Sequence, residues 1–206
     1  MKYDHTIVSI GRSFGAGGRA VGRELSRLMG IPFFDSELLK EAAGEFGFES
    51  VIFERADEKR PSVLRRLLSQ AYGVQETYNI KTALTGENIY QAQSLVIRAI
   101  AKRGPCIIIG RTADYVLRDF PGLVKVFVHA PLAFRARKIV ERGDAADVRQ
   151  AIELARQKDR RRQEYYNYFT GREWGSASNY DLSFDSSIVG AHTGARLIAE
   201  FIENIQ

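Results

Sequence analysis

Residues 11–19 read GRSFGAGGR, a glycine-rich stretch between two segments of different periodicity. Before it, residues 6–10 form a short apolar run rich in β-branched side chains, which is typical of a buried strand. After it, Val21, Leu25 and Leu28 recur at helical spacing. A strand, a glycine turn and a helix in this order favour a phosphate site, because backbone amides and the helix N-terminus can face an anion there. The alternative is a tight turn that binds nothing.

The remaining apolar runs predict a sheet. Segments 32–35, 106–109, 123–128 and 180–185 are short and mostly non-alternating, as expected of parallel strands buried on both faces. Helical patterns separate them, so we predict an α/β fold of the P-loop NTPase type with five parallel strands flanked by helices. Ligands of such sheets bind at the carboxyl ends of the strands.

The composition fits one globular domain of 206 residues, 45% of them apolar and 27% charged. No apolar run reaches the length of a membrane span, and the first residues lack the features of a secretory signal, so we expect a cytoplasmic protein. The single cysteine, Cys106, lies inside an apolar run and is interpreted as a core residue. The three histidines suggest no metal site.

We expect residues 1–206 to form a single domain with three parts. The core comprises residues 1–35, 104–134 and 178–206. A helical insertion spans residues 36–103, and an arginine-rich region spans residues 135–177.

The helical pattern predicts one long polar helical region from Leu132 to about Tyr168, and basic residues are concentrated in and just after it. Eleven of the thirty Lys and Arg residues lie between Arg135 and Arg172. A solvated helix face and a nucleic-acid surface are two explanations, but the chain contains no recognisable nucleic-acid module. The third explanation is a polyphosphate ligand, and the glycine turn favours it.

The chain resembles the nucleoside-monophosphate kinases, most closely their cytidylate kinase-like branch. The resemblance covers nearly the whole length and rests on the order and spacing of several segments. They are GRSFGAGGR, IPFFDSELL at residue 31, IIIGR at residue 107, KDRRR at residue 158 and YDLSFDSS at residue 180. It implies a phosphotransferase that uses ATP and Mg²⁺, with CMP or dCMP as acceptor, small nucleotides as its only partners, and a monomeric or weakly dimeric state.

On the donor side, the resemblance implies a phosphate-binding loop that lacks the usual lysine. Gly18 stands where a P-loop has its lysine, and Ala20 stands where we expect threonine. Arg19 is therefore expected to supply the missing charge and to act in catalysis. The full set of expected donor-binding residues is Gly11, Ser13, Gly15, Ala16, Gly17, Gly18 and Arg19.

On the acceptor side, the resemblance implies that Asp35, Ser36, Arg111 and Arg135 bind the substrate. Each has a simpler alternative: Asp35 or Ser36 could cap a helix, Arg111 could form an ion pair with Asp114, and Arg135 could lie on a solvated helix face.

Three positions depart from the family pattern on this side. Lys40 and Glu41 stand where the family has a phosphate-binding arginine, and Thr112 stands where it has an aspartate that selects cytosine. The choice of acceptor therefore stays open.

The resemblance also implies that the insertion of residues 36–103 binds the acceptor and that residues 135–177 form a lid. In this lid, Asp159 and Arg162 match an Asp-x-x-Arg pair of the family, which implies that Arg162 contacts phosphate and that Asp159 orients the site. Two other functions remain. One is a nucleotide sensor that lost turnover with the lysine, and the other is a kinase of another small phosphate acceptor.

Overall fold

The computed structural model describes residues 5–38 and 86–205. The chain divides into two compact units, one made of residues 1–35 and 104–206 and the other of residues 36–103. The first unit contains a five-stranded, entirely parallel sheet with strand order β2-β3-β1-β4-β5. The predicted P-loop-type α/β architecture is confirmed.

The strands fall where the apolar runs predict them. They are β1 (Ile7–Arg12), β2 (Phe33–Phe34), β3 (Cys106–Ile109), β4 (Leu123–His129) and β5 (Leu182–Asp185). The first strand continues two residues beyond the predicted end, because Arg12 stays in register with Val128 of β4. Arg12 is therefore the last residue of β1, at the carboxyl end of the sheet and next to the glycine turn.

Helices connect the strands. They are α1 (Gly18–Met29), α5 (Gly86–Arg103), α6 (Ala113–Val116), α7 (Leu132–Glu141), α8 (Val148–Thr170) and α9 (Ser186–Ile205), with a short 3₁₀ turn, η2 (Ala177–Asn179). Of the expected helical insertion, α5 is described, whereas residues 39–85 lie outside the described residues.

The polar stretch after residue 132, predicted as one long helical region, is two helices. Gly143 adopts φ +76° just after α7, a left-handed conformation that favours glycine. Asp147 then caps α8 by accepting a hydrogen bond from the amide of Gln150 at 2.8 Å. Together these residues end one helix and begin the next.

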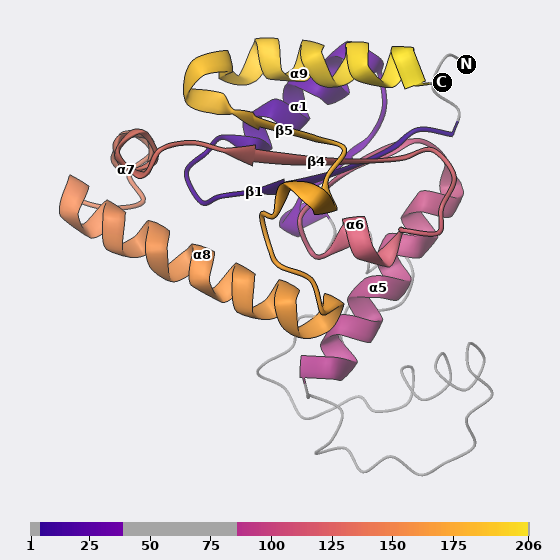
Figure 1. The fold of residues 1–206 in the computed structure, drawn as a ribbon, viewed down its shortest axis with the longest axis horizontal. Helices are drawn as coiled ribbons and strands as arrows, with labels where there is room; N and C mark the ends of the chain where they lie inside the picture. The colour runs from indigo at the N-terminus through magenta and orange to yellow at the C-terminus, as the bar shows by residue number, and fades with distance from the viewer. Residues whose placement is uncertain (1–4, 39–85, 206) are drawn as a thin grey trace. The chain divides into compact units, whose positions relative to one another are not determined.

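Helices α1 and α9 pack against one face of the sheet, while α6 and α8 lie on the other side (Figure 1). The core between sheet and helices is apolar and includes Val8, Ile10, Leu25, Val126 and Ile198, each almost completely buried. Burial of this kind is worth roughly 1.5–3 kcal/mol per large side chain. It holds the carboxyl edge of the sheet, where the loops begin, in a fixed place.

Candidate phosphate-binding site

The glycine turn after β1 has the backbone that its sequence predicts. Gly15 and Gly17 adopt φ +84° and +78°, conformations that side chains with a Cβ rarely adopt. Gly17 is the N-cap of α1, and no side chain caps this helix end. The first turn of α1 therefore presents its amides to whatever lies in front of it.

Some amides of the turn already donate to the protein. Ser13 N–H donates to the carbonyl of Val128 at 3.1 Å, and Ala16 N–H donates to the carbonyl of Ser13 at 3.2 Å. Across residues 5–38 and 86–205 no partner is found for the amides of Gly15, Gly17 and Gly18. Of the predicted donor-binding residues, these three have amides available for an anion in this conformation.

Gly11 faces a different environment. A Cβ at this position would lie 2.8 Å from the Phe127 ring and 3.3 Å from Tyr180. Phe127 also packs edge-on against Trp174, with ring centroids 5.4 Å apart. Close packing against aromatic rings therefore accounts for glycine here, and a phosphate role for Gly11 stays a prediction.

Arg19 pairs with Asp35 across the start of the site. Its Nε lies 2.6 Å from Asp35 Oδ2; the arginine side chain is 48% exposed and the aspartate 6%. The structure thus joins a predicted donor residue to a predicted acceptor residue. Ser36, the neighbour of Asp35, is half-buried and opens the second unit.

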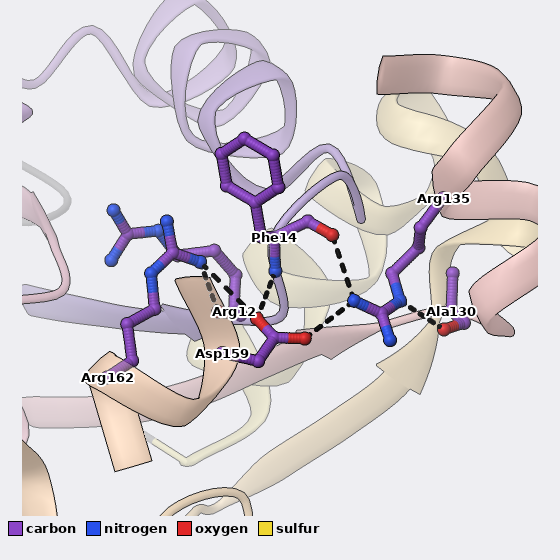
Figure 2. A network of polar contacts seen from close by, with 6 residues as sticks. All are labelled: Arg12, Phe14, Ala130, Arg135, Asp159 and Arg162. Carbon is purple, nitrogen blue, oxygen red and sulfur yellow. Dashed lines mark hydrogen bonds and ion pairs between the residues drawn. The ribbon is translucent and has the colours of Figure 1, made fainter. Parts of the chain in front are cut away.

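Asp159 joins α8 to the glycine turn (Figure 2). Its Oδ1 accepts a hydrogen bond from the amide of Phe14 at 2.7 Å, and its Oδ2 accepts one from Arg135 Nη1 at 2.6 Å. Arg135 also donates to the carbonyls of Phe14 and Ala130, at 3.0 and 2.9 Å. Two predicted site residues, Asp159 and Arg135, therefore act together in holding the turn.

Arg162 lies one helical turn from Asp159, on the same side of α8. Its Nη1 donates to the carbonyl of Arg12 at 3.0 Å and lies 4.0 Å from Asp159 Oδ1. Its guanidinium also lies over the Phe14 ring, 5.5 Å from the centroid. Burial lowers the pKa of Arg162, and the neighbouring Arg111, Arg135 and Arg142 lower it further while Asp159 opposes them.

Arg111 follows β3 in a strained turn. Gly110, Arg111 and Thr112 all adopt positive φ, of 72°, 59° and 54°, which is uncommon for residues with a side chain. No ion pair joins Arg111 to Asp114 in the described chain, because Asp114 is buried and accepts instead from the Tyr166 hydroxyl at 2.7 Å. Arg111 lies close enough to Arg12 and Arg162 to act on the pKa of both.

One residue of this group was missed by the sequence reasoning, namely Arg12. It is half-buried at the carboxyl end of β1, and its guanidinium lies beside that of Arg162 (Figure 2). A charged residue that ends a buried strand next to a glycine turn was the available signal, since such a residue lies at the ligand-binding edge of a parallel sheet.

The assembled site has an excess of positive charge. The charges of Arg111 and Arg162 act on Arg12, where Asp35 and Asp159 oppose them. Those of Arg111, Arg135 and Arg142 act on Arg162, where Asp159 opposes them. Like charges held together at a partly buried position favour binding of an anion that neutralises them. The described residues contain no group of three or more His, Cys, Asp or Glu side chains placed to hold a metal. No helix among them is long and apolar enough to cross a bilayer.

Solved structures define the class of fold. Shikimate kinase from Bacteroides thetaiotaomicron matches with a TM-score of 0.55 at 11% identity, covering 96% of this chain and 98% of that one. A gluconokinase from Sinorhizobium meliloti gives a TM-score of 0.53 at 14% identity, covering 98% and 97%. An uncharacterized protein from Eubacterium ventriosum gives 0.72 at 23% identity, covering 96% and 98%. The fold is that of the P-loop kinases.

The family follows from the sequence match. The model of the cytidylate kinase-like family covers residues 7–188, and the chain belongs to that family. It is also similar to cytidylate kinase from Pyrobaculum aerophilum, with 22% identity over 197 residues, covering 95% of this chain and 91% of that protein. The resemblance seen in the sequence is confirmed.

Proposed function

We propose that this protein transfers the γ-phosphoryl group of ATP–Mg²⁺ to a nucleoside monophosphate, with CMP or dCMP as the favoured acceptor. The observation that carries the proposal is the cluster of arginines around an uncapped glycine turn, in a chain of the cytidylate kinase-like family. The similar protein from Pyrobaculum aerophilum bears the name cytidylate kinase, which supports the choice of acceptor.

The glycine turn is the proposed donor site. The amides of Gly15, Gly17 and Gly18 would accept the ATP phosphates, with the N-terminus of α1 adding positive potential. Position 20 offers Mg²⁺ no hydroxyl, since it is alanine. The ion would therefore be held mainly by phosphate oxygens and water, as Mg²⁺ commonly is.

The acceptor would approach from the loop after β3 and from the end of β2. Arg111 and Asp35 stand at these two strand ends, and Arg19 links to the second of them through its ion pair. Thr112 is buried and its hydroxyl donates to the carbonyl of Arg111 at 2.6 Å. Because that hydroxyl is already engaged, base selection would come from other residues, and the test must include several bases.

The lid arginines would stabilise charge on the phosphoryl group during transfer. Arg162 is the proposed contact, because it is a partly buried cation beside the turn, while Asp159 and Arg135 position the turn. No covalent intermediate is required, since positioning and charge stabilisation account for most of phosphoryl transfer.

The test is an assay of ADP and nucleoside diphosphate formation with ATP–Mg²⁺ and a panel of nucleoside monophosphates. We expect turnover, fastest with CMP or dCMP. In Arg162→Met we expect kcat to fall about 10³-fold or more, the range of arginines that stabilise phosphoryl transfer. Arg149→Met is the matched control on the same helix, because its side chain is 91% exposed, and it should leave kcat unchanged.

A second candidate is a nucleotide sensor of the same fold. Gly18 and Ala20, which replace the usual lysine and threonine, are the observations that favour it. It predicts that ATP raises the melting temperature while no acceptor supports ADP production. Turnover only with a phosphate ester outside the nucleotide panel would instead indicate a kinase of another small acceptor. A cytoplasmic location and a monomeric or weakly dimeric state stay predictions.

A further inference from the structure

The side chain of Arg12 fills the space that a side chain at residue 18 would occupy. A Cβ built on Gly18 would lie 2.7 Å from Arg12 Cβ and 2.9 Å from its Cγ, closer than real Cβ atoms approach other atoms. Gly18 has an ordinary helical φ, so its backbone does not require glycine. The position is glycine because the stem of Arg12 crosses it.

The guanidinium of Arg12 ends over the loop that follows β3. A Cβ built on Gly110 would collide with Arg12 Nη1. Gly110 precedes Arg111, the proposed acceptor-binding residue, and Gly18 lies in the proposed donor turn. The Arg12 side chain therefore runs from the donor side of the site to the acceptor side, where the transferred phosphoryl group must pass.

The environment of Arg12 disfavours a cation in the absence of a ligand. Burial, followed by the charges of Arg162 and Arg111, lowers its pKa to about 9, and Asp35 and Asp159 oppose this only in part. Arg12 thus remains charged at neutral pH with its desolvation incompletely compensated. An anion between Arg12, Arg111 and Arg162 would relieve both the desolvation and the repulsion.

We propose that Arg12 is the cation that binds the phosphoryl group under transfer, in place of the lysine that P-loops carry at residue 18. The inference rests on the proposed function and deepens it, because it assigns the charge of the donor site to a residue at the end of β1. Arg19, the neighbour of Gly18, is committed to Asp35 at 2.6 Å and is nearly half exposed.

The first experiment measures binding of the ATP analogue AMPPNP with Mg²⁺ by calorimetry. Arg12→Met keeps most of the aliphatic stem and removes the charge. It should raise the Kd about ten- to a hundred-fold, the range of a charge-assisted phosphate hydrogen bond. Arg12→Lys should recover part of the affinity. Arg196→Met, an exposed arginine on α9, is the control and should bind as wild type.

The melting temperature of ligand-free Arg12→Met distinguishes a role of Arg12 in binding from a role in stability. The carbonyl of Arg12, which accepts from Arg162, is unchanged in Arg12→Met. Because the charge is disfavoured in the free protein, the melting temperature of Arg12→Met should equal or exceed that of wild type. A clear decrease in melting temperature with unchanged Kd would assign Arg12 to structure and overturn the inference.

The second experiment is a double-mutant cycle with Gly18→Ala. In wild type the new Cβ displaces the Arg12 stem, so AMPPNP affinity should fall. With Arg12→Ala already present, Gly18→Ala should cost little further affinity. An equal loss in both backgrounds would mean that the Cβ acts on the nucleotide directly, and would overturn the inference.

The failure of this inference is distinguishable from that of the proposed function. If wild type neither binds AMPPNP–Mg²⁺ nor turns over any nucleoside monophosphate, the proposed function fails and the inference with it. If wild type binds and turns over while Arg12→Met does both equally well, the inference alone is overturned.

Discussion

At the scale of single residues, Asp159 joins the glycine turn to α8 and, through Arg135, to α7. One carboxylate oxygen fixes the Phe14 amide and the other binds Arg135, which in turn holds the Phe14 carbonyl. The side chain is 17% exposed, so these charge-assisted hydrogen bonds are partly shielded from water. Without the negative charge of Asp159, the positive charges of Arg135 and Arg162 would be less neutralised, in a region that is already positive.

Asp159→Asn should therefore destabilise the protein and weaken nucleotide binding together. We expect a loss of about 1.5–3 kcal/mol in the free energy of unfolding, the range of hydrogen bonds to charged groups. Urea unfolding measures it, and calorimetry with AMPPNP measures the affinity. The matched control is Asp144→Asn, whose partner Arg142 is 48% exposed, and it should stay within about 0.5 kcal/mol of wild type. Equal effects of the two substitutions would contradict this role of Asp159.

At the scale of elements, α8 packs against α7 through Ala151 and Ala155 and makes side-chain hydrogen bonds to its unit at two further places. Near its middle, Asp159 and Arg162 bind the glycine turn, and near its end the Tyr166 hydroxyl donates to Asp114 of α6. The second attachment is buried, and burial raises the pKa of Asp114 while the Tyr166 hydrogen bond lowers it. The Tyr166 bond therefore stabilises the charged form of Asp114.

Tyr166→Phe removes the donor and leaves a buried carboxylate short of one hydrogen bond. We expect the free energy of unfolding to fall by about 1–3 kcal/mol at pH 8. A carboxyl group whose pKa is raised in the folded state favours folding at low pH. The loss should therefore shrink as the pH falls through the pKa of Asp114 and the group becomes protonated.

Denaturant unfolding of both proteins from pH 8 to pH 4 checks this expectation. The control is Tyr168→Phe on the same helix, because Tyr168 is 70% exposed. If Tyr166→Phe lowered the free energy of unfolding by the same amount at every pH, the hydrogen bond would not depend on the charge of Asp114, and the expectation would be wrong.

At the scale of the whole molecule, the sequence predicts what depends on local pattern. The strand order along the chain, the start of α1 at Gly18 and the buried Cys106 follow from apolar runs and glycine positions. The spacing of Asp159 and Arg162 likewise places both on one side of a helix. Each of these features is decided within a few neighbouring residues.

The features that sequence reasoning missed depend on contacts between distant segments. The Arg12 side chain lies against Gly18 and Gly110, because neither glycine has a Cβ that would block it. Gly110 comes near Arg12 only when β1 and β3 pair in the sheet. Gly11 belongs to an aromatic cluster formed by β4 and the segment before β5. No periodicity in the chain reports such a contact. The break between α7 and α8 does have a local signal, Gly143, which the prediction of one long helical region left out.

The central claim is that the turn between β1 and α1 binds the phosphates of a nucleotide. Its most direct test is a ¹H–¹⁵N correlation spectrum of the assigned protein, titrated with AMPPNP–Mg²⁺. We predict the largest shifts at the amides of Gly15, Gly17 and Gly18 and at the Arg12 side-chain Nε–H. Saturable binding with these signals unmoved, and with the shifts centred on another part of the chain, would contradict the account.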